Sequence, residues 1–396
     1  MTVDRRIGQH IKALRMRRGL TMTVAAGLAG ITQSYWSMIE NSRRPVNSRE
    51  LLERIAKALR VSSLEITGKP FDSVDPASRS ILAMMADLGD VLTGWRIGEN
   101  PGPEAARPWG QLSAELGVLN GRLRPDAEYE AQAEMLPDLI RGLLVATDTA
   151  DRSAALMGLI SAYKASAYLA HDLGVAGLPT LAAERINQVA EATGDDGWVA
   201  YATYQRAQLL SGTNRQRQLE LALTVADTSQ ARAETRGLAH LTAALACAVN
   251  GDADQARTHM AEATALAQGI GPDVSPWMQT NFGRENVKIW SVTIGLELGE
   301  GLRAVEHIGG WQPRAVSKSR QATYWLDVSR ALASERKHYA RGIRTLELAE
   351  ALTPQKIHTN MFAREIVALA PGNVRAGAEG DIVRRLSYRM GINPSR

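Results

Sequence analysis

The feature that most limits the fold is a series of alanine-rich helical segments, separated by short turns, that follows from about residue 77 onward. No part of this region alternates apolar and polar residues with the period of two that a half-buried strand requires. One helical hairpin cannot bury its apolar face alone, so successive hairpins must stack on one another. The sequence therefore predicts an all-α protein in which residues 77–396 form an α-solenoid.

The turns inside the predicted hairpins recur at separations of about 38, 39, 48 and 37 residues, somewhat longer than the roughly 34 of a tetratricopeptide repeat. The clearest hairpin spans residues 237–267. The section 77–150 is less regular, and we expect two or three helices there, including 111–121 and 126–147. The aligned turns are Leu173-Gly174, Ser211-Gly212, Asn250-Gly251-Asp252, Leu298-Gly299-Glu300 and Ser334-Glu335-Arg336. We therefore expect tetratricopeptide-like hairpins.

Charge divides the chain into two parts. Residues 1–76 hold 13 Lys and Arg against 7 Asp and Glu, whereas the rest of the chain holds 33 against 35. The net charge of +4 is thus an average over a basic head and a near-neutral body. This division indicates that only the head meets a polyanion such as nucleic acid. We expect a DNA-binding domain over 1–68, a linker over 69–76, and the α-solenoid as a second domain over 77–396.

The head is dense in signals for short helices. Helices are predicted over 21–29 and 33–41, and Thr32 is the expected N-cap of the second. Gly30 lies in the tight turn between them, and Ser48 is the expected N-cap of the longer helix that follows. Five short helices in about 65 residues, with a glycine-containing turn between the second and the third, are typical of a helix-turn-helix domain.

The helix predicted over 33–41 has a polar face suited to DNA. On a helical wheel, one arc of about 140° holds Gln33, Ser34, Ser37, Met38 and Asn41. Trp36 and Ile39 lie on the opposite side and are expected in the core. In the major groove, Gln can bond N6 and N7 of adenine, Ser can bond several base edges, and Met can contact a thymine methyl. We therefore predict that Gln33, Ser34, Ser37 and Met38 read base edges.

Basic side chains flank this helix. Arg43 and Arg44 follow its C-terminal end, and Arg17 and Arg18 close the first helix. Contacts to phosphate fix the register of a protein on DNA without reading its sequence. The residues expected at phosphates are Arg17, Arg18, Thr32, Tyr35, Arg43 and Arg44.

Residues 7–68 resemble an XRE-type (phage-repressor-like) helix-turn-helix domain of five helices. The resemblance is carried by Leu14-Arg15, Gly19-Leu20-Thr21, Ala26, Gly30-Ile31-Thr32-Gln33-Ser34 and Ile39-Glu40. It implies base contacts from Gln33, Ser34 and Met38, and a buried ion pair between Arg15 and Glu40. The chain departs from the family pattern at Met22, where a phosphate-contacting Gln is common, and at Met38, which is often Arg or Gln. These departures imply greater reliance on DNA shape.

A looser resemblance covers roughly residues 100–370. Segments such as RPWGQLSAELGVLNGRLR and TNFGRENVKIWSVTIGLELGEGLRAVE are similar to actinobacterial XRE-family regulators with a tetratricopeptide-like C-terminal sensor. The two-part layout also resembles the peptide-pheromone receptors that Gram-positive bacteria use in quorum sensing. The resemblance implies an effector-binding body, but the ligands of the family are diverse or unidentified.

An α-solenoid offers a concave groove lined by the first helix of each hairpin. Amides on this groove can bond an extended peptide backbone, and a basic side chain can meet a carboxylate. Polar or aromatic stripes are expected on helices 197–211, 281–298 and 320–333, the last of which also offers Arg320 and Asp327. The candidate effector-binding residues are Trp198, Tyr201, Gln205, Asn281, Arg284, Lys288 and Tyr324. The alternative for the aromatic residues is that they pack between repeats.

The sequence lacks the motifs of an enzyme. The single cysteine, Cys247, excludes an internal disulfide and lies in an alanine-rich segment, where we expect a small buried residue. The seven histidines form no HExxH or HxxxH pattern, and no phosphate-binding GxxxxGK[ST] loop occurs. We expect no catalysis, no cofactor and no metal. The N-terminus, MTVDRRIGQH, has no apolar stretch typical of a secretory signal, and we expect a cytoplasmic protein without a membrane partner.

These observations favour a sequence-specific transcriptional regulator whose body binds a peptide or small-molecule effector. A lone head makes few base contacts, so we expect a homodimer on paired half-sites of a palindromic double-stranded DNA operator. One alternative is a protein-interaction scaffold that the head tethers to DNA. Another is a repressor that works without an effector.

Overall fold

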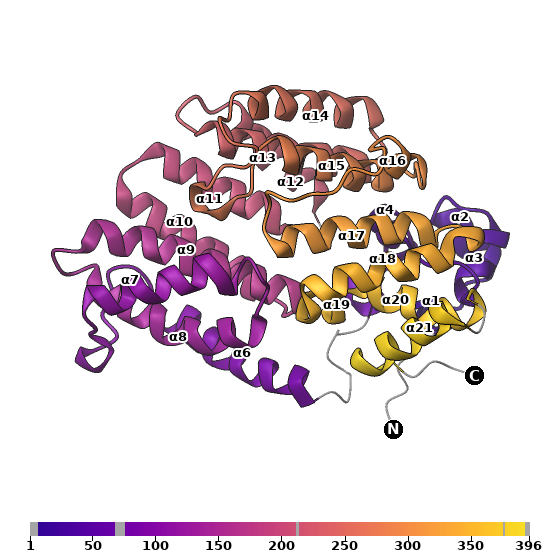
Figure 1. The fold of residues 1–396 in the computed structure, drawn as a ribbon, viewed down its shortest axis with the longest axis horizontal. Helices are drawn as coiled ribbons and strands as arrows, with labels where there is room; N and C mark the ends of the chain where they lie inside the picture. The colour runs from indigo at the N-terminus through magenta and orange to yellow at the C-terminus, as the bar shows by residue number, and fades with distance from the viewer. Residues whose placement is uncertain (1–6, 68–75, 211–213, 375–376, 393–396) are drawn as a thin grey trace.

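The computed structural model describes residues 7–67, 76–210, 214–374 and 377–392. All regular structure in these ranges is helical, which confirms the predicted all-α fold of a helix-turn-helix head followed by a helical array (Figure 1). The predicted linker, 69–76, lies outside the described residues except at Pro76, where the first helix of the body begins.

Five short helices form the head, as predicted. They are α1 (Ile7–Arg17), α2 (Met22–Leu28), α3 (Gln33–Glu40), α4 (Arg49–Leu59) and α5 (Ser63–Thr67). Thr32 and Ser48 are the N-caps of α3 and α4, because their hydroxyls accept the backbone N–H groups of Tyr35 and Leu51 at 3.2 and 3.1 Å. The head has its own apolar core, in which Trp36 and Ile39 of α3 are buried as predicted.

The body is a curved array of helical pairs. Its longer helices are α6 (Pro76–Gly94), α7 (Trp109–Val118), α8 (Tyr129–Ala146), α9 (Arg152–Asp172), α10 (Leu178–Thr193), α11 (Asp196–Leu209), α12 (Arg215–Ala226), α13 (Ala233–Val249), α14 (Ala253–Gln268), α15 (Arg284–Glu297), α17 (Lys318–Ala333), α18 (Tyr339–Leu352) and α21 (Ala378–Arg389). Its shorter ones are α16 (Arg303–Glu306), α19 (Pro354–Thr359) and α20 (Met361–Leu369), with 3-10 turns η1 (Pro103–Ala105), η3 (Trp277–Gln279), η4 (Arg336–His338) and η5 (Ala370–Gly372) and a π turn η2 (Leu119–Leu123).

Four of the five predicted hairpin turns separate consecutive helices: α9 from α10, α13 from α14, α15 from α16, and α17 from α18. The fifth, Ser211-Gly212, lies outside the described residues. The helices predicted over 111–121 and 126–147 are α7, which continues into η2, and α8. Cys247 is buried within α13, as expected.

The array does not stay open as the predicted solenoid groove would. The helices α17 and α19 return to the start of α8 and the end of α9, where Lys318 pairs with Asp126 at 2.8 Å and Lys356 pairs with Asp172 at 3.5 Å (Figure 1). The backbone N–H of Ser319 also donates to the carbonyl of Pro125 at 2.7 Å. The contacts between distant helices turn the groove into a central cavity.

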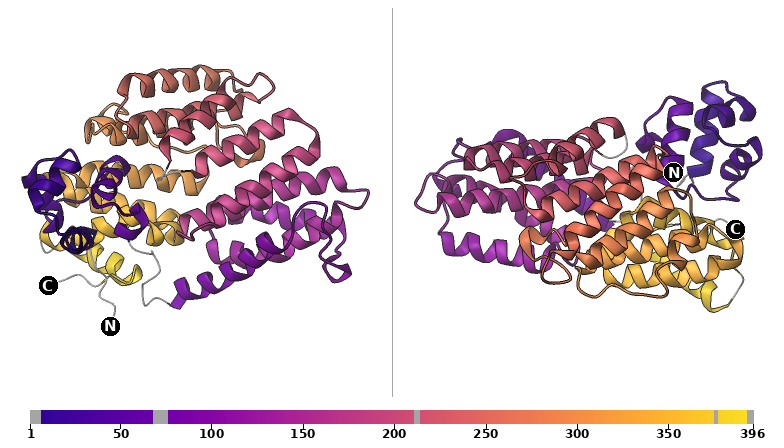
Figure 2. Two further views of the ribbon diagram at one scale, coloured as in Figure 1. Left: turned by 180° about the vertical axis from the view of Figure 1, so that it is seen from behind. Right: turned by 90° about the horizontal axis from the view of Figure 1, so that it is seen from above.

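The head stands out from the body at the end formed by α17–α21, as the view from above shows (Figure 2). Its α4 faces the body, and Met361 of α20 packs against the apolar core of the head. The cavity and the head therefore share a boundary.

Candidate nucleic-acid interface and central cavity

The recognition helix α3 is oriented by its buried side. Trp36 and Ile39 are only 1% and 2% exposed, whereas Gln33 and Ser34 are exposed and Ser37 and Met38 are partly exposed. The burial of one side of the helix leaves the predicted base-reading side as the accessible one.

A buried polar cluster fixes α3 to α1. The guanidinium of Arg15 donates to Glu40 through Nε (2.6 Å) and Nη2 (2.9 Å), and the indole N–H of Trp36 donates to the same carboxylate at 2.6 Å. The hydrogen bond to Glu40 raises the pKa of Arg15. The ion pair that the resemblance implied is therefore confirmed, and it has a structural role.

The four predicted base-reading residues differ in how exposed they are and in whether their side chains already make hydrogen bonds within the head. Ser34 is exposed, and Gln33 uses only its carbonyl oxygen, which accepts the hydroxyl of Thr23 at 3.0 Å. The amide of Asn41 donates to the Ser37 hydroxyl at 3.3 Å, so Ser37 is partly engaged within the helix. Gln33 and Ser34, in the first turn of α3, are the most accessible pair.

The arginines expected at phosphates lie in two places. Arg43 is exposed and makes no ion pair or side-chain hydrogen bond with a described residue, whereas Arg44 donates to the backbone carbonyl of Ser334 in the body. Arg17 pairs with Glu65 of α5 at 2.6 Å, and Arg18 donates to the carbonyl of Arg60 after α4. The structure therefore does not bring the two arginine pairs together.

The remaining two residues of this set have roles within the head. The Thr32 hydroxyl accepts the N-cap hydrogen bond, and Tyr35 is partly buried. Burial raises the pKa of the Tyr35 phenol, which Arg44 and Arg54 partly offset. Both side chains keep a hydroxyl near the start of α3.

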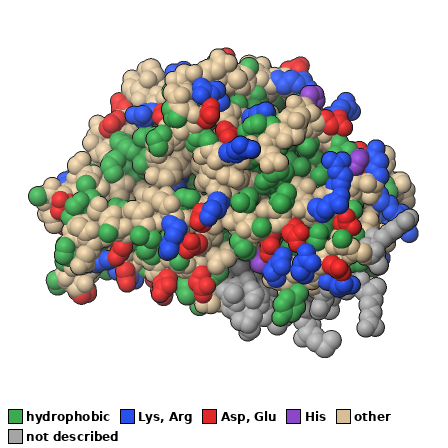
Figure 3. Space-filling view, viewed as in Figure 1, with side chains coloured by type: hydrophobic (Ala, Val, Ile, Leu, Met, Phe, Trp, Pro, Cys, Tyr) green, Lys and Arg blue, Asp and Glu red, His purple; other side chains and the backbone are tan. Residues whose placement is uncertain are grey.

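Basic side chains also gather on the body beside the head. The turn η4 holds Arg336 and Lys337, both exposed, and follows directly on the Ser334 that Arg44 contacts. In the space-filling view, Lys and Arg are frequent at the end where this turn lies, whereas Asp and Glu follow the opposite lower edge (Figure 3). The positive surface of the head thus continues onto the body.

One carboxylate of the body holds the head in place. The Oε2 atom of Glu297 accepts the backbone N–H of Arg49 at 2.7 Å, at the N-terminus of α4, and its Oε1 atom accepts the Arg49 guanidinium at 3.2 Å. A carboxylate at a helix N-terminus is stabilised by the unpaired N–H groups and the helix dipole. The Glu297 side chain is fully buried.

Arg330 extends this docking network. It donates to Glu297 at 3.0 Å, to Asp327 at 2.7 Å and to the backbone carbonyl of Asn47 in the head at 2.7 Å. The docking network, here Arg49, Glu297, Asp327 and Arg330, therefore joins α4 to α15 and α17. It contains two arginines and two carboxylates, so its formal net charge is zero.

A second, separate ion pair joins head and body on another side of α4. Arg215, the first residue of α12, binds the carboxylate of Glu53 through Nε (3.1 Å) and Nη2 (2.8 Å). Two-point binding of this kind fixes geometry as well as charge. Of these residues, sequence reasoning named only Asp327, and for effector binding, because the partners that join head and body lie 162 to 283 residues apart.

The central cavity has a volume of about 870 Å³, within the range of small-molecule sites. It is lined by α8, α9, α11, α15, α17 and α19, by the segment 272–281 and by the first residue of α4. The polar lining residues used below are Arg49, Arg124, Lys164, Gln205, Asn281 and Arg320. Arg49 belongs to the head, so the head itself forms part of the cavity wall.

The segment before α15 holds unusual backbone. Met278, Gln279 and Asn281 have φ angles of 47, 48 and 55°, which are uncommon for residues with a side chain. The ring of Phe282 anchors this segment against Gly237, where an added Cβ would lie 1.9 Å from a ring atom. Strained backbone of this kind often lies at ligand sites.

Of the seven predicted effector residues, the structure places Gln205 and Asn281 in the cavity wall. Gln208, within the helix predicted over 197–211, also lines it, as do Arg320 and Asp327 of the helix predicted over 320–333. Tyr201 is fully buried, and its ring contacts Trp198 and Trp277 at centroid distances of 5.7 and 5.1 Å. For Trp198 and Tyr201, the alternative of packing within the body describes the contacts better.

The other three of the seven predicted residues also lie outside the lining of this cavity. Arg284 is exposed and pairs with Asp273 at 2.8 Å, and the ammonium of Lys288 lies over the ring of Trp311 at 4.6 Å. Tyr324 is buried and donates its hydroxyl to the carbonyl of Trp311 at 2.7 Å. The predicted helix 281–298 begins only at Arg284, so the expected stripe does not form.

Sequence reasoning missed Arg124 and Lys164, and it named Arg320 only as part of the stripe predicted on helix 320–333. The signal for Lys164 was present, because it is the one charged residue in the otherwise uncharged run SAYKASAYLA. Nothing local distinguishes Arg124 from a surface arginine.

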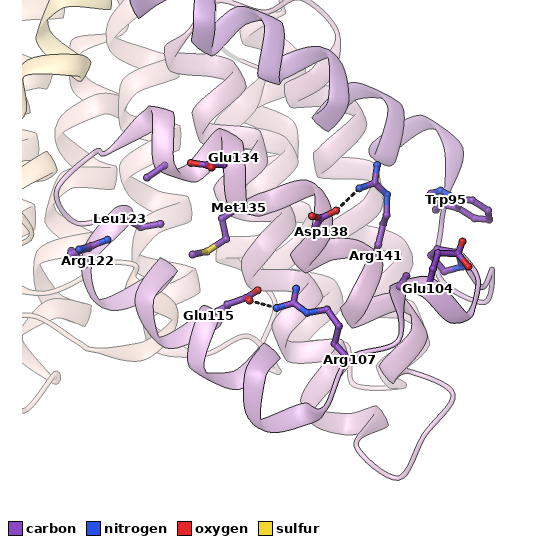
Figure 4. Close-up of a pocket in the computed structure, with 13 residues that line it drawn as sticks. Trp95, Glu104, Arg107, Glu115, Arg122, Leu123, Glu134, Met135, Asp138 and Arg141 are labelled. Carbon is purple, nitrogen blue, oxygen red and sulfur yellow. Dashed lines mark hydrogen bonds and ion pairs between the residues drawn. The ribbon is translucent and has the colours of Figure 1, made fainter.

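A second depression, of about 840 Å³, lies between α7, α8 and the turn around Pro103 (Figure 4). Its arginines are matched: Arg107 pairs with Glu115, and Arg141 pairs with Asp138 at 2.7 Å. The third, Arg122, lies 3.7 Å from Glu128. This depression holds no unmatched cation among its lining residues.

The described residues form neither a metal site nor a membrane span. No group of three or more His, Cys, Asp and Glu could hold a metal ion there. No helix within the described ranges is both long and apolar enough to cross a membrane.

Comparison with known proteins bears on the head. No curated protein and no solved structure matches the chain. Residues 6–66 match a family model described as a helix-turn-helix domain, and this match supports a DNA-binding regulator.

Proposed function

We propose that this chain is a cytoplasmic, sequence-specific transcriptional regulator whose body binds a small-molecule or short peptide effector in the central cavity. The head reads DNA through the first turn of α3, mainly with Gln33 and Ser34. Two copies act as a homodimer on paired half-sites, because one head makes few base contacts.

Effector control is supported above all by Arg49, which belongs both to the head and to the wall of the central cavity. It is the first residue of α4 in the head, it lines the central cavity, and it pairs with Glu297 of the docking network. A ligand beside Arg49 competes with or reinforces that pair. Because α4 is part of the compact head, any shift at its N-terminus changes the orientation of α3.

Selection of bound duplexes from a random library by the full-length protein tests the DNA-reading role. We expect one enriched motif with two half-sites. Gln33→Ala should weaken binding to that motif by about 1–3 kcal/mol and blur the preference at one base position. The matched control is Gln255→Ala on the exposed side of α14, which should change neither the affinity for the motif nor the base preference.

Equal weakening of Gln33→Ala on selected and on random DNA would remove Gln33 from base reading. Selection that enriches no motif would favour the scaffold alternative, in which the head binds DNA only as a tether.

A further inference from the structure

The cations that line the central cavity fall into two groups. Arg49 pairs with Glu297, and Lys356 pairs with Asp172. Arg124, Lys164 and Arg320 have no carboxylate of a described residue within 4.0 Å. The wall of the cavity therefore carries three basic side chains that contact no carboxylate of a described residue.

Neutral acceptors hold two of these cations in place. The ammonium of Lys164 donates to the carbonyl of Met278 at 2.7 Å, and Arg124 donates to the side-chain oxygens of Asn120 and Gln279 at 2.9 and 3.0 Å. Both cations therefore bind the strained segment before α15. Lys164 is only 4% exposed.

Arg320 approaches the same space from α17. Its Nε donates to Asn286 at 2.6 Å, and its guanidinium lies 5.2 Å from the centre of the Trp290 ring. Its Nη2 atom is buried and has no hydrogen-bond partner among the described residues. The charge of Asp327, which binds Arg330 and Thr293, partly offsets the lowering of the Arg320 pKa, but its carboxylate makes no ion pair or hydrogen bond with Arg320.

Such an arrangement does not stabilise the empty protein. A buried cation without an opposite charge loses hydration without regaining it in an ion pair. Burial lowers the pKa of Arg124 and of Lys164, the latter well below its ordinary value, and burial lowers the pKa of Arg320 to about 10. Proximity to Arg124 lowers the pKa of Lys164 further.

The rest of the wall suits an organic molecule that carries a negative group. Gln205 presents a buried amide whose nitrogen and oxygen make no hydrogen bond, and Asn281 and Trp290 line the same space. Amides can bond the polar groups of such a molecule, and the ring can cover an apolar part. The matched arginines of the depression in Figure 4 offer no comparable site.

We propose that Arg124, Lys164 and Arg320 bind the anionic group, a carboxylate or a phosphate, of a small organic effector in the central cavity. The anion supplies the charge that the wall lacks and binds Arg320 through its free Nη2 atom. The proposal deepens the proposed function by naming the ligand class, but its test uses no DNA.

The test is a thermal shift of the full-length protein in citrate and, separately, in pyrophosphate, each against sodium chloride at the same ionic strength. We expect at least one of the two anions to raise the Tm by roughly 2–4 °C, with a saturable concentration dependence. A rise with citrate alone indicates a carboxylate ligand, and a rise with pyrophosphate alone indicates a phosphate.

Three variants locate the effect. Arg320→Gln and Lys164→Gln should lose the anion-dependent rise while they keep or exceed the wild-type Tm without anion, since each removes a buried basic group that contacts no carboxylate of a described residue. Arg257→Gln, an exposed arginine on α14, should keep the whole rise. A structural role of the two residues would instead lower the Tm of both cavity variants without anion.

The proposal is overturned if neither anion raises the Tm, or if Arg320→Gln and Lys164→Gln respond as strongly as the wild type. Either result leaves DNA reading by the head untouched. Conversely, anion binding that changes no DNA affinity would contradict effector control but would uphold the anion site.

Discussion

The head and the central cavity both bury arginine side chains, but the head pairs its arginine with a carboxylate and the cavity does not. In the head, Arg15 meets the carboxylate of Glu40, which Trp36 also binds. In the cavity, Arg320 and Lys164 meet only neutral acceptors. A matched charge specifies one packing arrangement, whereas an unmatched charge keeps binding capacity for a ligand. The first site serves stability, and under the proposed function the second serves ligand recognition.

The largest loss of stability is expected when the ion pair of the head is broken. Glu40→Gln leaves the buried guanidinium of Arg15 without a counter-charge, which should destabilise the head by about 3–5 kcal/mol. Hydrogen exchange of the α1 and α3 amides in the full-length protein measures this loss. The matched control is Glu65→Gln, whose pair with Arg17 is exposed, and we expect a loss of less than about 1 kcal/mol there. Similar losses in the two variants would contradict the contrast.

A smaller effect of opposite sign is expected in the cavity. Because the pKa of Lys164 is lowered in the folded state, the unfolded chain binds more protons above the folded pKa and below about 10.5. The free energy of unfolding should therefore gain up to about 1.4 kcal/mol per pH unit from this group as pH rises through that window.

Lys164→Met removes this gain. The difference in the free energy of unfolding between Lys164→Met and wild type, from urea titrations between pH 7 and pH 10, should favour the variant at pH 7 and shrink as pH rises. A difference that does not change with pH would show that Lys164 is not perturbed by burial.

The smallest effect concerns the surface arginines of the head. Arg43 makes no ion pair or side-chain hydrogen bond with a described residue, so Arg43→Ala should lower the slope of log K against log salt by about 1 on any duplex. Arg17→Ala should lower the slope less, because Glu65 already binds that guanidinium. Equal slopes for Arg43→Ala and wild type would exclude a phosphate contact by Arg43.

The parts of the molecule that depend on local sequence could be predicted. Thr32 and Ser48 cap helices a few residues away, and Trp36 faces the core because of helical spacing alone. The turns between paired helices follow from Gly and Asp at short range. These features need no knowledge of the rest of the chain.

The cavity could be predicted only in part. Gln205 was found because its helix has a regular polar stripe, but Arg284 was placed in the site because helix 281–298 was expected to begin three residues earlier than it does. The left-handed backbone at Asn281 keeps this residue out of the helix that begins at Arg284. The closure of the array and the pairing of Arg49 with Glu297 join residues far apart in the chain, and no local pattern encodes them.

The central claim is that the docked head is the form that binds paired half-sites, since Gln33 and Ser34 are exposed while Glu297 holds α4. Glu297→Gln weakens the docking of the head, although the Arg215–Glu53 pair remains, and adds orientational freedom that DNA binding must remove. The decisive measurement is the Kd of wild type, Glu297→Gln and the exposed control Glu262→Gln for a selected duplex with two half-sites and for one with a single half-site. We expect Glu297→Gln alone to bind the paired duplex at least about fivefold more weakly, a coupling of 1 kcal/mol or more, with the single half-site unchanged. Equal affinities of all three proteins for the paired duplex would contradict the claim.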